Sequence, residues 1–436
     1  MAAMHMANSY DPASGESDPE DAELLARRHS VLGAPYRLFY SRPVALVRGA
    51  GSHLFDSAGE DYLDAYNNVP VIGHSHPRVA EAVSGALTTL STHTRYLTDP
   101  VVSYAEELTA LMPEPLSQVV FACSGSEAVD LSLRVARHVT GRRGVIITSH
   151  AYHGTTQASA EISPSLGPNN AVPGHVVAVS PPDPTVDPDA EQTFAAAVEA
   201  AASELERRGH GVAALIVDSI LISDGLVLSE RPLLRGAAAV VRTHGGLYIA
   251  DEVQAGFGRT GSWWGFAAHD VVPDLVVLGK PMGNGMPISA VVGRPEHFDR
   301  FGRDVRYFNT FAGNGACIAA AGVVLDEIAD SDLRGHATRV GARLMRGLRD
   351  IVAARGADAA VRGRGLVVAV ELGEGGRADA ARHARAVVDG LRDRRILVSA
   401  SGPGENVVKI RPPLVFDDDD VDRFLEGFDE VLRATG

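Results

Sequence analysis

Short apolar segments recur along the middle of the chain, and segments with a helical period separate several of them. Val, Ile and Leu dominate the apolar segments, whereas the stretches 126–139 and 191–208 are amphipathic. An unbroken aliphatic run is typical of a strand buried on both faces, and helices between such strands favour parallel pairing. The pattern therefore predicts an open, mostly parallel α/β sheet with helices on both faces. Its strands are expected at 118–122, 144–148, 176–180, 213–218, 246–250, 274–278 and 288–292.

The pattern on either side of this region predicts a second, smaller domain. Residues 1–20 are polar and acidic without an apolar period, so we expect them to be disordered. Within residues 21–75, the stretch 44–66 alternates around glycines as a hairpin does, and residues 321–436 combine long helices with a few strands. We therefore expect a large domain over 76–320 and a small α+β domain formed by the N-terminal and C-terminal parts.

Composition and charge exclude several classes of function. The 436 residues are 45% hydrophobic and 22% charged, as in globular proteins, and no apolar run is long enough to span a membrane. The net charge of −15 and the scattered arginines argue against a nucleic-acid partner. Cys123 and Cys317 are too few for a disulfide framework, and the histidines lack zinc-ligand spacing. We expect a cytoplasmic protein with free thiols and no metal site.

Lysine is rare in this chain, because only Lys280 and Lys409 interrupt an otherwise arginine-based set of 40 basic side chains. A lysine in that background indicates a task that needs an amine able to lose its proton. Attack on a carbonyl to form a Schiff base is the clearest such task. Lys280 follows the predicted strand 274–278 and lies among glycines, which let other groups approach closely. An ordinary surface lysine is the alternative.

Three further groups stand at the carboxyl ends of predicted strands, where ligands bind in open α/β sheets. The Ser-Gly-Ser sequence at 124–126 opens a helix, so it is either a phosphate site or a cap made by Ser126. Asp251 ends a buried strand, either facing a protonated ring nitrogen or capping a helix. Tyr152 either stacks on a planar ligand or packs in the core. Only in combination with Lys280 do these groups indicate a binding site.

Together, a Schiff-base lysine, a phosphate cradle, a strand-end carboxylate and an aromatic side chain describe a site for pyridoxal phosphate. From about residue 40 to its end, the chain resembles the class III (subgroup II) aminotransferases, which are fold-type I pyridoxal-phosphate enzymes. The resemblance implies a large domain with a mostly parallel seven-stranded sheet. The matching segments are Tyr62-Leu-Asp64, Gly73-His-Ser-His-Pro77, Ser124-Gly-Ser-Glu-Ala128, Tyr152-His-Gly154, Ala250-Asp-Glu-Val-Gln254, Gly279-Lys280-Pro and Phe308-Asn-Thr-Phe311.

The resemblance implies a role for each residue around the cofactor ring. Lys280 would form the Schiff base and move the proton during catalysis. Asp251 would pair with the ring nitrogen and keep it protonated, and Gln254 would hydrogen-bond the phenolic oxygen. Val253 would pack on one face of the ring and Tyr152 would stack on the other.

The resemblance also implies where the cofactor phosphate binds. Ser124, Gly125 and Ser126 would hold it, and Thr310 would reach the phosphate bound by the neighbouring subunit. This last role implies an obligate homodimer with active sites at the subunit interface.

Several segments are similar to the ethanolamine-phosphate phospho-lyase branch of the family. Where transaminases of this class more often have an arginine that clamps a carboxylate, this chain has Lys409, whose point charge suits phosphate. We therefore predict a phospho-lyase that eliminates phosphate from the β carbon of a small phosphorylated amine. O-phosphoethanolamine would yield acetaldehyde, ammonia and phosphate. The candidate substrate residues are Asn68, Arg95, Tyr96, Lys409 and Arg411, with surface salt bridges as the alternative for both arginines.

Two other functions stay open at this point. One is an ω-type transaminase that moves an amino group from a primary amine to a 2-oxo acid. The other is a catalytically silent homologue that acts as a binding or scaffold subunit, which the presence of Lys280, Asp251 and Gln254 disfavours.

Overall fold

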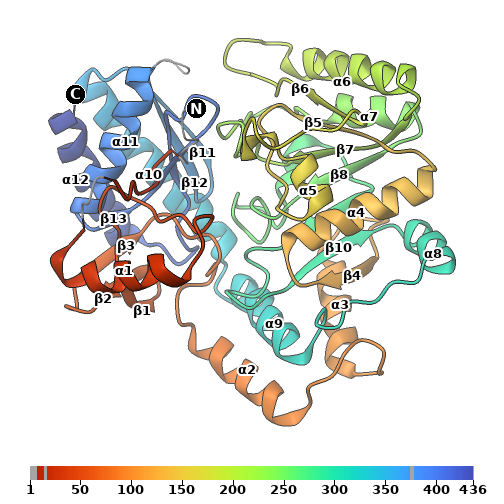
Figure 1. Cartoon of the computed structure of the whole chain (residues 1–436), viewed down its shortest axis with the longest axis horizontal. Coiled ribbons are helices and arrows are strands. Elements are labelled where there is room, and N and C mark those ends of the chain that lie inside the picture. Colours follow the sequence, from red (N-terminus) through yellow and green to blue (C-terminus); the bar gives the residue numbers. More distant parts are fainter. Residues whose placement is uncertain (1–6, 14–16, 374–377, 436) are drawn as a thin grey trace. The chain divides into compact units, whose positions relative to one another are not determined.

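The computed structural model describes residues 7–13, 17–373 and 378–435 (Figure 1). The chain forms two compact units. The large unit comprises Asn68–Ile72 and His76–Thr338. The small unit comprises Gly73–Ser75, Arg339–Gly436 and Met1–Asn67, as far as these are described. No described helix combines the length and the apolar character that a membrane span requires.

The large unit contains a seven-stranded sheet, which confirms the predicted α/β class. The strand order is β4-β10-β9-β8-β7-β5-β6. All pairs are parallel except those of β10, which runs antiparallel to both β4 and β9. The strands are β4 (Gln118–Ala122), β5 (Gly144–Thr148), β6 (Val176–Val179), β7 (Val212–Asp218), β8 (Leu247–Asp251), β9 (Leu275–Leu278) and β10 (Ser289–Gly293).

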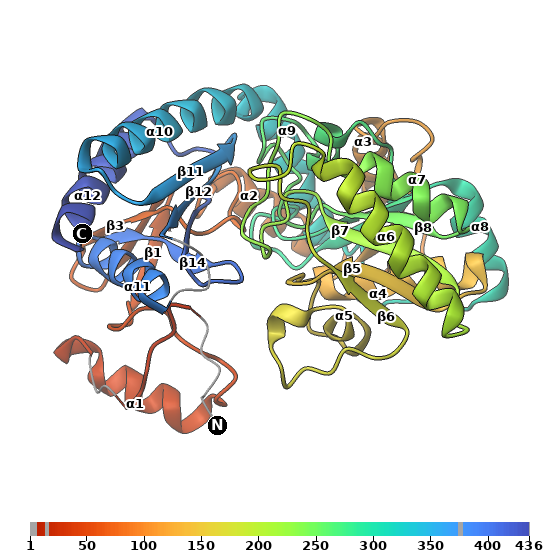
Figure 2. The ribbon, with the colours of Figure 1, turned by 90° about the horizontal axis from the view of Figure 1, so that it is seen from above.

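Helices cover both faces of this sheet. Figure 2 shows α4 (Gly125–Thr140) and α5 (Gln157–Glu161) on one face, with α6 (Ala190–Arg207) and α7 (Arg235–Thr243) on the other. The apolar stripe of α4 packs into the core beneath it, because its buried positions recur every three or four residues. The remaining helices of this unit are α2 (Pro77–Thr89), α3 (Asp99–Ala110), η2 (Pro164–Leu166), η3 (Gly265–His269), α8 (Pro295–Asp304) and α9 (Gly315–Asp330).

The small unit combines two four-stranded sheets with helices. One sheet has the order β1-β2-β3-β13 and the other β11-β12-β15-β14. The parallel pairing of Leu63 with Ile396 joins the N-terminal hairpin to the C-terminal segment. The strands are β1 (Leu46–Ala50), β2 (His53–Asp56), β3 (Asp61–Asp64), β11 (Ala359–Arg364), β12 (Val367–Leu372), β13 (Ile396–Leu397), β14 (Ser399–Ser401) and β15 (Val407–Ile410). The helices are η1 (Pro19–Asp21), α1 (Ala22–Val31), α11 (Ala378–Asp393) and α12 (Asp418–Thr435), and α10 (Leu333–Arg355) contains the boundary between the units.

The boundary between the units differs from the one expected at residue 320. That position lies inside α9, which packs against α2 and α3 and therefore belongs to the large unit. The chain leaves the large unit only after Thr338, within α10. A long helix shared by two units carries no break in its own apolar pattern, so the sequence gives no local signal for this boundary.

The N-terminal segment expected to be disordered is partly ordered. Residues 1–6 and 14–16 lie outside the described residues. Asn8 and Tyr10 are buried, and Tyr10 N–H donates to the carbonyl of Leu38 at 2.9 Å. The Tyr40 N–H returns a bond of 2.8 Å to the Asn8 carbonyl. A partner some thirty residues away along the chain supplies these bonds, which explains why the local composition did not reveal them.

Candidate active site

Six strands of the large sheet end at the same edge. β5, β6, β7, β8 and β9 are mutually parallel, and β4 shares their direction because both it and β9 run antiparallel to β10. Asp218 is paired in register with Asp251 across β7 and β8, and Asp251 is paired with Val277 of β9. The side chains that follow these strand ends are therefore brought together, as the sequence predicts for an open α/β sheet.

A cavity of about 100 Å³ opens at this edge. Its walls come from the segments that follow β4, β5, β8 and β9 and from the last residues of β7 and β8. Lys280 lies in it together with most of the residues expected to hold a cofactor. The lining residues are Gly125, Ser126, Tyr152, His153, Gly154, Asp218, Asp251, Val253, Gln254 and Lys280.

Asp251 is held from two sides at the end of β8. Its Oδ1 accepts a hydrogen bond of 3.0 Å from the Val253 N–H, and its Oδ2 lies 2.7 Å from Nδ1 of His153. Both side chains are almost fully buried. Since a carboxylate only accepts hydrogen bonds, Nδ1 of His153 is the donor. The alternative of a simple helix cap does not hold, because this carboxylate faces a cavity and pairs with an imidazole.

A second carboxylate, Asp218, lies at the same cavity wall. Its oxygens accept bonds of 3.0 Å from the N–H groups of Ile220 and Ile222. Burial, reinforced by the charge of Asp251, raises the pKa of Asp218 to about 6. Two acidic groups so close together favour a cationic ligand group or a proton between them.

Glu252, the neighbour of Asp251, points away from this chemistry. It is fully buried and accepts bonds of 2.7 and 2.8 Å from the N–H groups of Gly265 and Phe266. Burial raises the pKa of Glu252 to about 7. Its hydrogen bonds fasten the loop after β8, so this residue serves the structure and does not line the cavity.

The N-terminus of α4 lies at the cavity and is capped by Ser124. The Ser124 hydroxyl accepts the N–H of Glu127 at 3.3 Å, as an N-cap residue does. Ser126 is not the cap, because its Oγ accepts the Thr155 N–H at 3.1 Å. Gly125 and Ser126 line the cavity, whereas Ser124 does not. The positive end of the helix dipole is thus directed at the cavity, which favours an anion there.

Close backbone approach around the cavity depends on glycine. A Cβ at Gly279 would lie 3.4 Å from Cα of Gly125 and 3.3 Å from a methyl of Val253. The segment that carries Lys280 therefore passes directly beside the N-terminus of α4. This arrangement explains why glycines precede Lys280 and open the helix.

Replacement of Gly154 by alanine is expected to weaken cofactor binding by at least about tenfold. The new Cβ would lie 2.5 Å from Oγ of Ser126 and 2.6 Å from Oγ of Ser159, and the φ of +141° is unfavourable for any other residue. Ser126, at the start of α4 where the phosphate is expected to bind, would have to shift. Titration of the apo-protein with pyridoxal phosphate measures the loss. Gly141→Ala is the matched control, because it also has a positive φ but no atom within 4 Å of the new Cβ. Equal cofactor affinity in both variants would contradict the prediction.

Gln254 is oriented by Asn68. The Asn68 amide donates to Oε1 of Gln254 at 3.3 Å, and Asn68 is buried. The bond fixes Oε1 of Gln254 as an acceptor, while its NH₂ group is a donor by its chemistry. One predicted substrate residue therefore positions a predicted cofactor residue.

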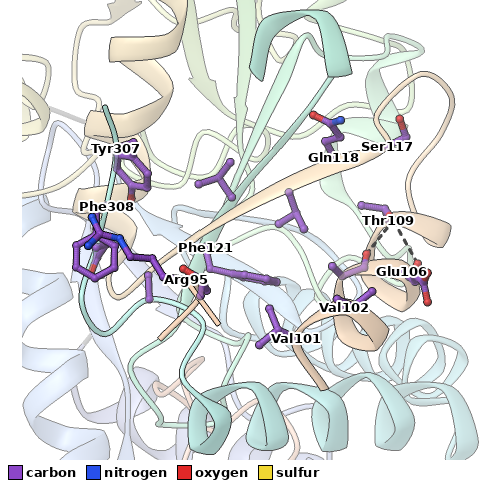
Figure 3. A pocket seen from close by; sticks show the side chains of 16 residues that line it. Arg95, Val101, Val102, Glu106, Thr109, Ser117, Gln118, Phe121, Tyr307 and Phe308 are labelled. Atoms are coloured by element: carbon purple, nitrogen blue, oxygen red, sulfur yellow. Dashed lines mark hydrogen bonds between the residues drawn. The ribbon is translucent and has the colours of Figure 1, made fainter. Parts of the chain in front are cut away.

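Arg95 and Tyr96 lie outside the cavity that contains Lys280. Arg95 stacks over the ring of Phe308, 3.7 Å from its centroid, and lines a larger cavity of about 590 Å³ (Figure 3). Tyr96 is 65% exposed and stacks on His93. Thr310 is also exposed and does not line the Lys280 cavity. The two cavities share no lining residue, and the larger one contains neither a lysine nor a pair of carboxylates.

Lys409 and Arg411 belong to the small unit. Lys409 is half-buried on β15, where it pairs with Ala369 and Ser399. Arg411 is buried, and its guanidinium lies 4.9 Å from the ring centroid of Tyr66. The role of both residues toward a substrate stays a prediction.

Our sequence reasoning did not include three residues of the cavity wall among the site residues, namely His153, Gly154 and Asp218. His153 directly follows Tyr152 and was given no role, although its position after a buried strand is the same signal that identified its neighbour. Gly154 was likewise not singled out. Their importance depends on Asp251 and Ser126, which lie far away along the chain.

The residues at this edge fit pyridoxal phosphate. Lys280 supplies an amine, α4 a helix N-terminus for a phosphate, and Asp251 a buried carboxylate for a protonated ring nitrogen. A Cβ at Gly154 would occupy the space beside Ser126 at the start of α4. That space therefore exists only because residue 154 has no side chain.

Comparison with known proteins agrees with this chemistry. The class III aminotransferase family model matches residues 39–432. A Drosophila melanogaster protein named alanine–glyoxylate aminotransferase 2-like is 39% identical over 94% of this chain and 87% of its own. The Caenorhabditis elegans ethanolamine-phosphate phospho-lyase homolog 1 is 34% identical over 94% of this chain and 93% of its own.

A solved structure of a phospholyase from Arthrobacter, in complex with phosphoethanolamine, is also similar. It is 41% identical, covers 94% of this chain and 99% of its own, and superimposes with a TM-score of 0.90. The chain belongs to the class III aminotransferases, a family of pyridoxal-phosphate-dependent enzymes that includes transaminases and phospho-lyases.

Proposed function

We propose that this enzyme is a pyridoxal-phosphate-dependent phospho-lyase that acts on a small phosphorylated amine such as O-phosphoethanolamine. The products would be acetaldehyde, ammonia and inorganic phosphate. The observation that carries the choice is the 41% identity, across nearly the whole chain, to a phospholyase whose structure holds phosphoethanolamine. Lys409, in the place where transaminases of this class more often have an arginine, supports the same choice.

Different residues of the cavity are proposed to bind different parts of the cofactor. Gly125 and Ser126 offer the N-terminus of α4 to its phosphate, and Asp251 offers a carboxylate to its ring nitrogen. Val253 and Tyr152 would lie against the two faces of the ring, and Gln254 would donate to its phenolic oxygen. Bound pyridoxal phosphate supplies an electron sink for the carbon that carries the amine.

Lys280 is the residue proposed to move the proton. It would accept the proton from the carbon that bears the amine, after which the bond between the neighbouring carbon and the phosphate oxygen breaks. The electron pair of the broken C–O bond leaves with the phosphate, and water completes the release of ammonia and acetaldehyde. Lys409 and Arg411 are proposed to receive the phosphate, because a departing dianion is stabilised by nearby cations.

We further propose a homodimer that buries part of the large unit. Tyr96, Leu97 and Phe311 are 65%, 95% and 71% exposed, and Phe308 lies beside Arg95 in the same region (Figure 3). Large apolar side chains in such a group favour an interface. Thr310, in the same segment, would then reach the cofactor phosphate of the partner subunit. Light scattering that shows a monomer at working concentration would contradict this proposal.

A cytoplasmic location accords with the cysteines. Cys123 and Cys317 are both free. Cytoplasmic proteins keep such thiols reduced, so we propose this compartment for the enzyme. Fractionation that finds the protein outside the cytoplasm would contradict it.

Phosphate release from O-phosphoethanolamine, followed with and without pyruvate, tests the proposed reaction. We expect phosphate and acetaldehyde in equal amounts and at the same rate in both reactions, because elimination needs no amino-group acceptor. Ethanolamine without the phosphate is the control substrate. Alanine formed from pyruvate without any phosphate release would show that the enzyme is a transaminase.

The transaminase remains the second candidate. The Drosophila melanogaster relative, 39% identical, is named as an aminotransferase. Both elimination and transamination need Lys280, Asp251 and the helix N-terminus, so these groups are compatible with either reaction. The residues that contact the substrate distinguish the two reactions.

A further inference from the structure

We propose that Asn309 is a positioning residue that acts on the cofactor site of the partner subunit. Its side chain closes the turn that carries Thr310 and fastens this turn to the start of α4. The inference rests on the proposed homodimer, in which Thr310 reaches the cofactor phosphate bound by the partner. Asn309 itself would touch neither the cofactor nor the substrate.

The segment that carries Thr310 has no helix or strand to hold it. α8 ends at Asp304 and α9 begins at Gly315, so residues 305–314 connect the two helices without regular structure. Thr310 is exposed in this segment, and the neighbouring side chain of Phe311 is 71% exposed. A side chain that binds a ligand precisely must be held by the hydrogen bonds and packing around it. The position of Thr310 therefore depends on bonds made by the residues beside it.

Asn309 closes a turn around Thr310. Its Oδ1 accepts the N–H of Phe311 at 3.2 Å, so that Thr310 lies between the two bonded residues. Asparagine side chains commonly bond to the backbone two residues further on, and such a bond takes the place of a backbone turn. The amide of Asn309 thus restrains the backbone on both sides of Thr310.

The NH₂ group of Asn309 connects this turn to α4. Its Nδ2 donates to Oε2 of Glu127 at 3.1 Å. Glu127 is itself held in place, because its Oε2 also accepts the Cys123 N–H at 2.8 Å and its own N–H donates to Ser124 at 3.3 Å. These reciprocal bonds fix the first turn of the helix, as those of a capping box do. The turn around Thr310 is therefore fastened to a rigid point of the large unit.

The bonds that Glu127 makes to the start of α4 do not need Asn309. Replacement of Asn309 by alanine leaves both of them in place, so the phosphate site of the same subunit keeps its support. Thr310, in contrast, loses the bond that closes its turn and the bond that fastens the turn. We therefore expect the loss of Asn309 to weaken cofactor binding in the partner subunit.

Mixed dimers separate an effect within one subunit from an effect across the interface. Two differently tagged subunits are co-expressed, and the dimer that contains one of each is purified through both tags. One subunit always carries Lys280→Ala, so only the other can attach pyridoxal phosphate covalently. Pyridoxal phosphate is titrated, the attachment is fixed with borohydride, and mass spectrometry of the subunit that keeps Lys280 gives the occupied fraction.

Homodimeric variants give the size of each effect. Thr310→Val is expected to weaken cofactor binding by about tenfold or more, because a hydroxyl bond to a charged phosphate is lost. Asn309→Ala should weaken it by about five- to tenfold. The double variant should match Thr310→Val within about twofold, because Asn309 acts through Thr310. Thermal unfolding and light scattering check that each variant is a folded dimer.

Two mixed dimers place Asn309→Ala on opposite sides of the same site. When the change is in the subunit that keeps Lys280, the Thr310 of that site comes from the other subunit. We then expect the affinity of the reference, a mixed dimer of wild type and Lys280→Ala, within about twofold. When Asn309→Ala is instead in the Lys280→Ala subunit, we expect the full loss seen in the Asn309→Ala homodimer.

Three results would overturn the inference. A loss that follows the subunit with Lys280, or equal losses in both mixed dimers, would mean that Asn309 supports its own subunit. Unchanged affinity in the Asn309→Ala homodimer, together with a loss in Thr310→Val, would mean that Asn309 does not position Thr310. Unchanged affinity in Thr310→Val would refute the proposed dimer contact and this inference together.

Failure of the proposed reaction is detected separately. The phosphate-release assay reports on the reaction, whereas the borohydride readout needs no turnover. A protein that releases no phosphate but shows the expected pattern in the mixed dimers would refute the phospho-lyase and support the role of Asn309.

Discussion

Lys280→Ala is expected to lower the rate of phosphate release by about 10⁴-fold or more, because both the attacking amine and the proton acceptor disappear. The variant should still take up pyridoxal phosphate without a covalent bond. Asp251, Gln254 and the N-terminus of α4 remain in place to hold it. Borohydride treatment followed by denaturation measures covalent attachment, and equilibrium dialysis measures the bound cofactor.

Lys280→Arg is the matched control for charge. An arginine keeps the positive charge but does not lose its proton under these conditions, so we expect it to be as inactive as the alanine variant. Turnover above about one per cent of the wild-type rate in either variant would show that Lys280 is not the reacting amine. Loss of cofactor uptake together with turnover would instead indicate that the substitution disturbs the cavity.

Lys409→Ala is expected to raise KM for a phosphorylated amine by about 100-fold and to change KM for an unphosphorylated amine little. A charge-assisted bond to a phosphate accounts for an effect of this size, whereas an amine without phosphate makes no such bond. The strand supports this role, because Lys409 is half-buried between the buried residues Val408 and Ile410 on β15. Initial rates of phosphate release measure KM for the phosphorylated amine, and competitive inhibition of that release by the unphosphorylated amine gives the corresponding constant for the amine without phosphate.

Lys409→Arg separates charge from shape. The guanidinium fork prefers a planar carboxylate, so we expect the arginine variant to regain only part of the affinity for the phosphorylated amine. Equal increases in KM for both substrates in Lys409→Ala would mean that Lys409 does not contact phosphate. A full recovery in Lys409→Arg would mean that charge alone is read at this position.

The sequence predicted the strands of the large sheet well for a physical reason. A parallel strand buried on both faces is apolar along most of its length, and the runs 145–147 and Leu275–Leu278 carry that requirement in their own residues. Lys280 was singled out from the sequence in the same way, since the rarity of lysine among the arginines is visible without any tertiary contact. Local features of this kind need no knowledge of the fold.

The contacts that tune the cavity were not predicted. His153 reaches Asp251, Asn68 reaches Gln254, and Thr155 reaches Ser126, each across a long stretch of chain. The alternative of a cap made by Ser126 does not hold, because Ser124, two residues earlier, accepts the Glu127 N–H. Which of two serines caps a helix depends on backbone angles that the composition does not reveal.

By itself, the sequence determined the α/β class, the alternation of strands and helices, and the amine at Lys280, because each follows from residues that are neighbours in the chain. The tertiary structure decided that the Asp251 carboxylate contacts the His153 imidazole. It also decided that Gly154 leaves space beside Ser126 at the start of α4. It also decided that Arg95 lies over Phe308, outside the cavity that contains Lys280. These contacts depend on strand order and on pairing between segments that are distant in the sequence. No local periodicity in the sequence specifies them.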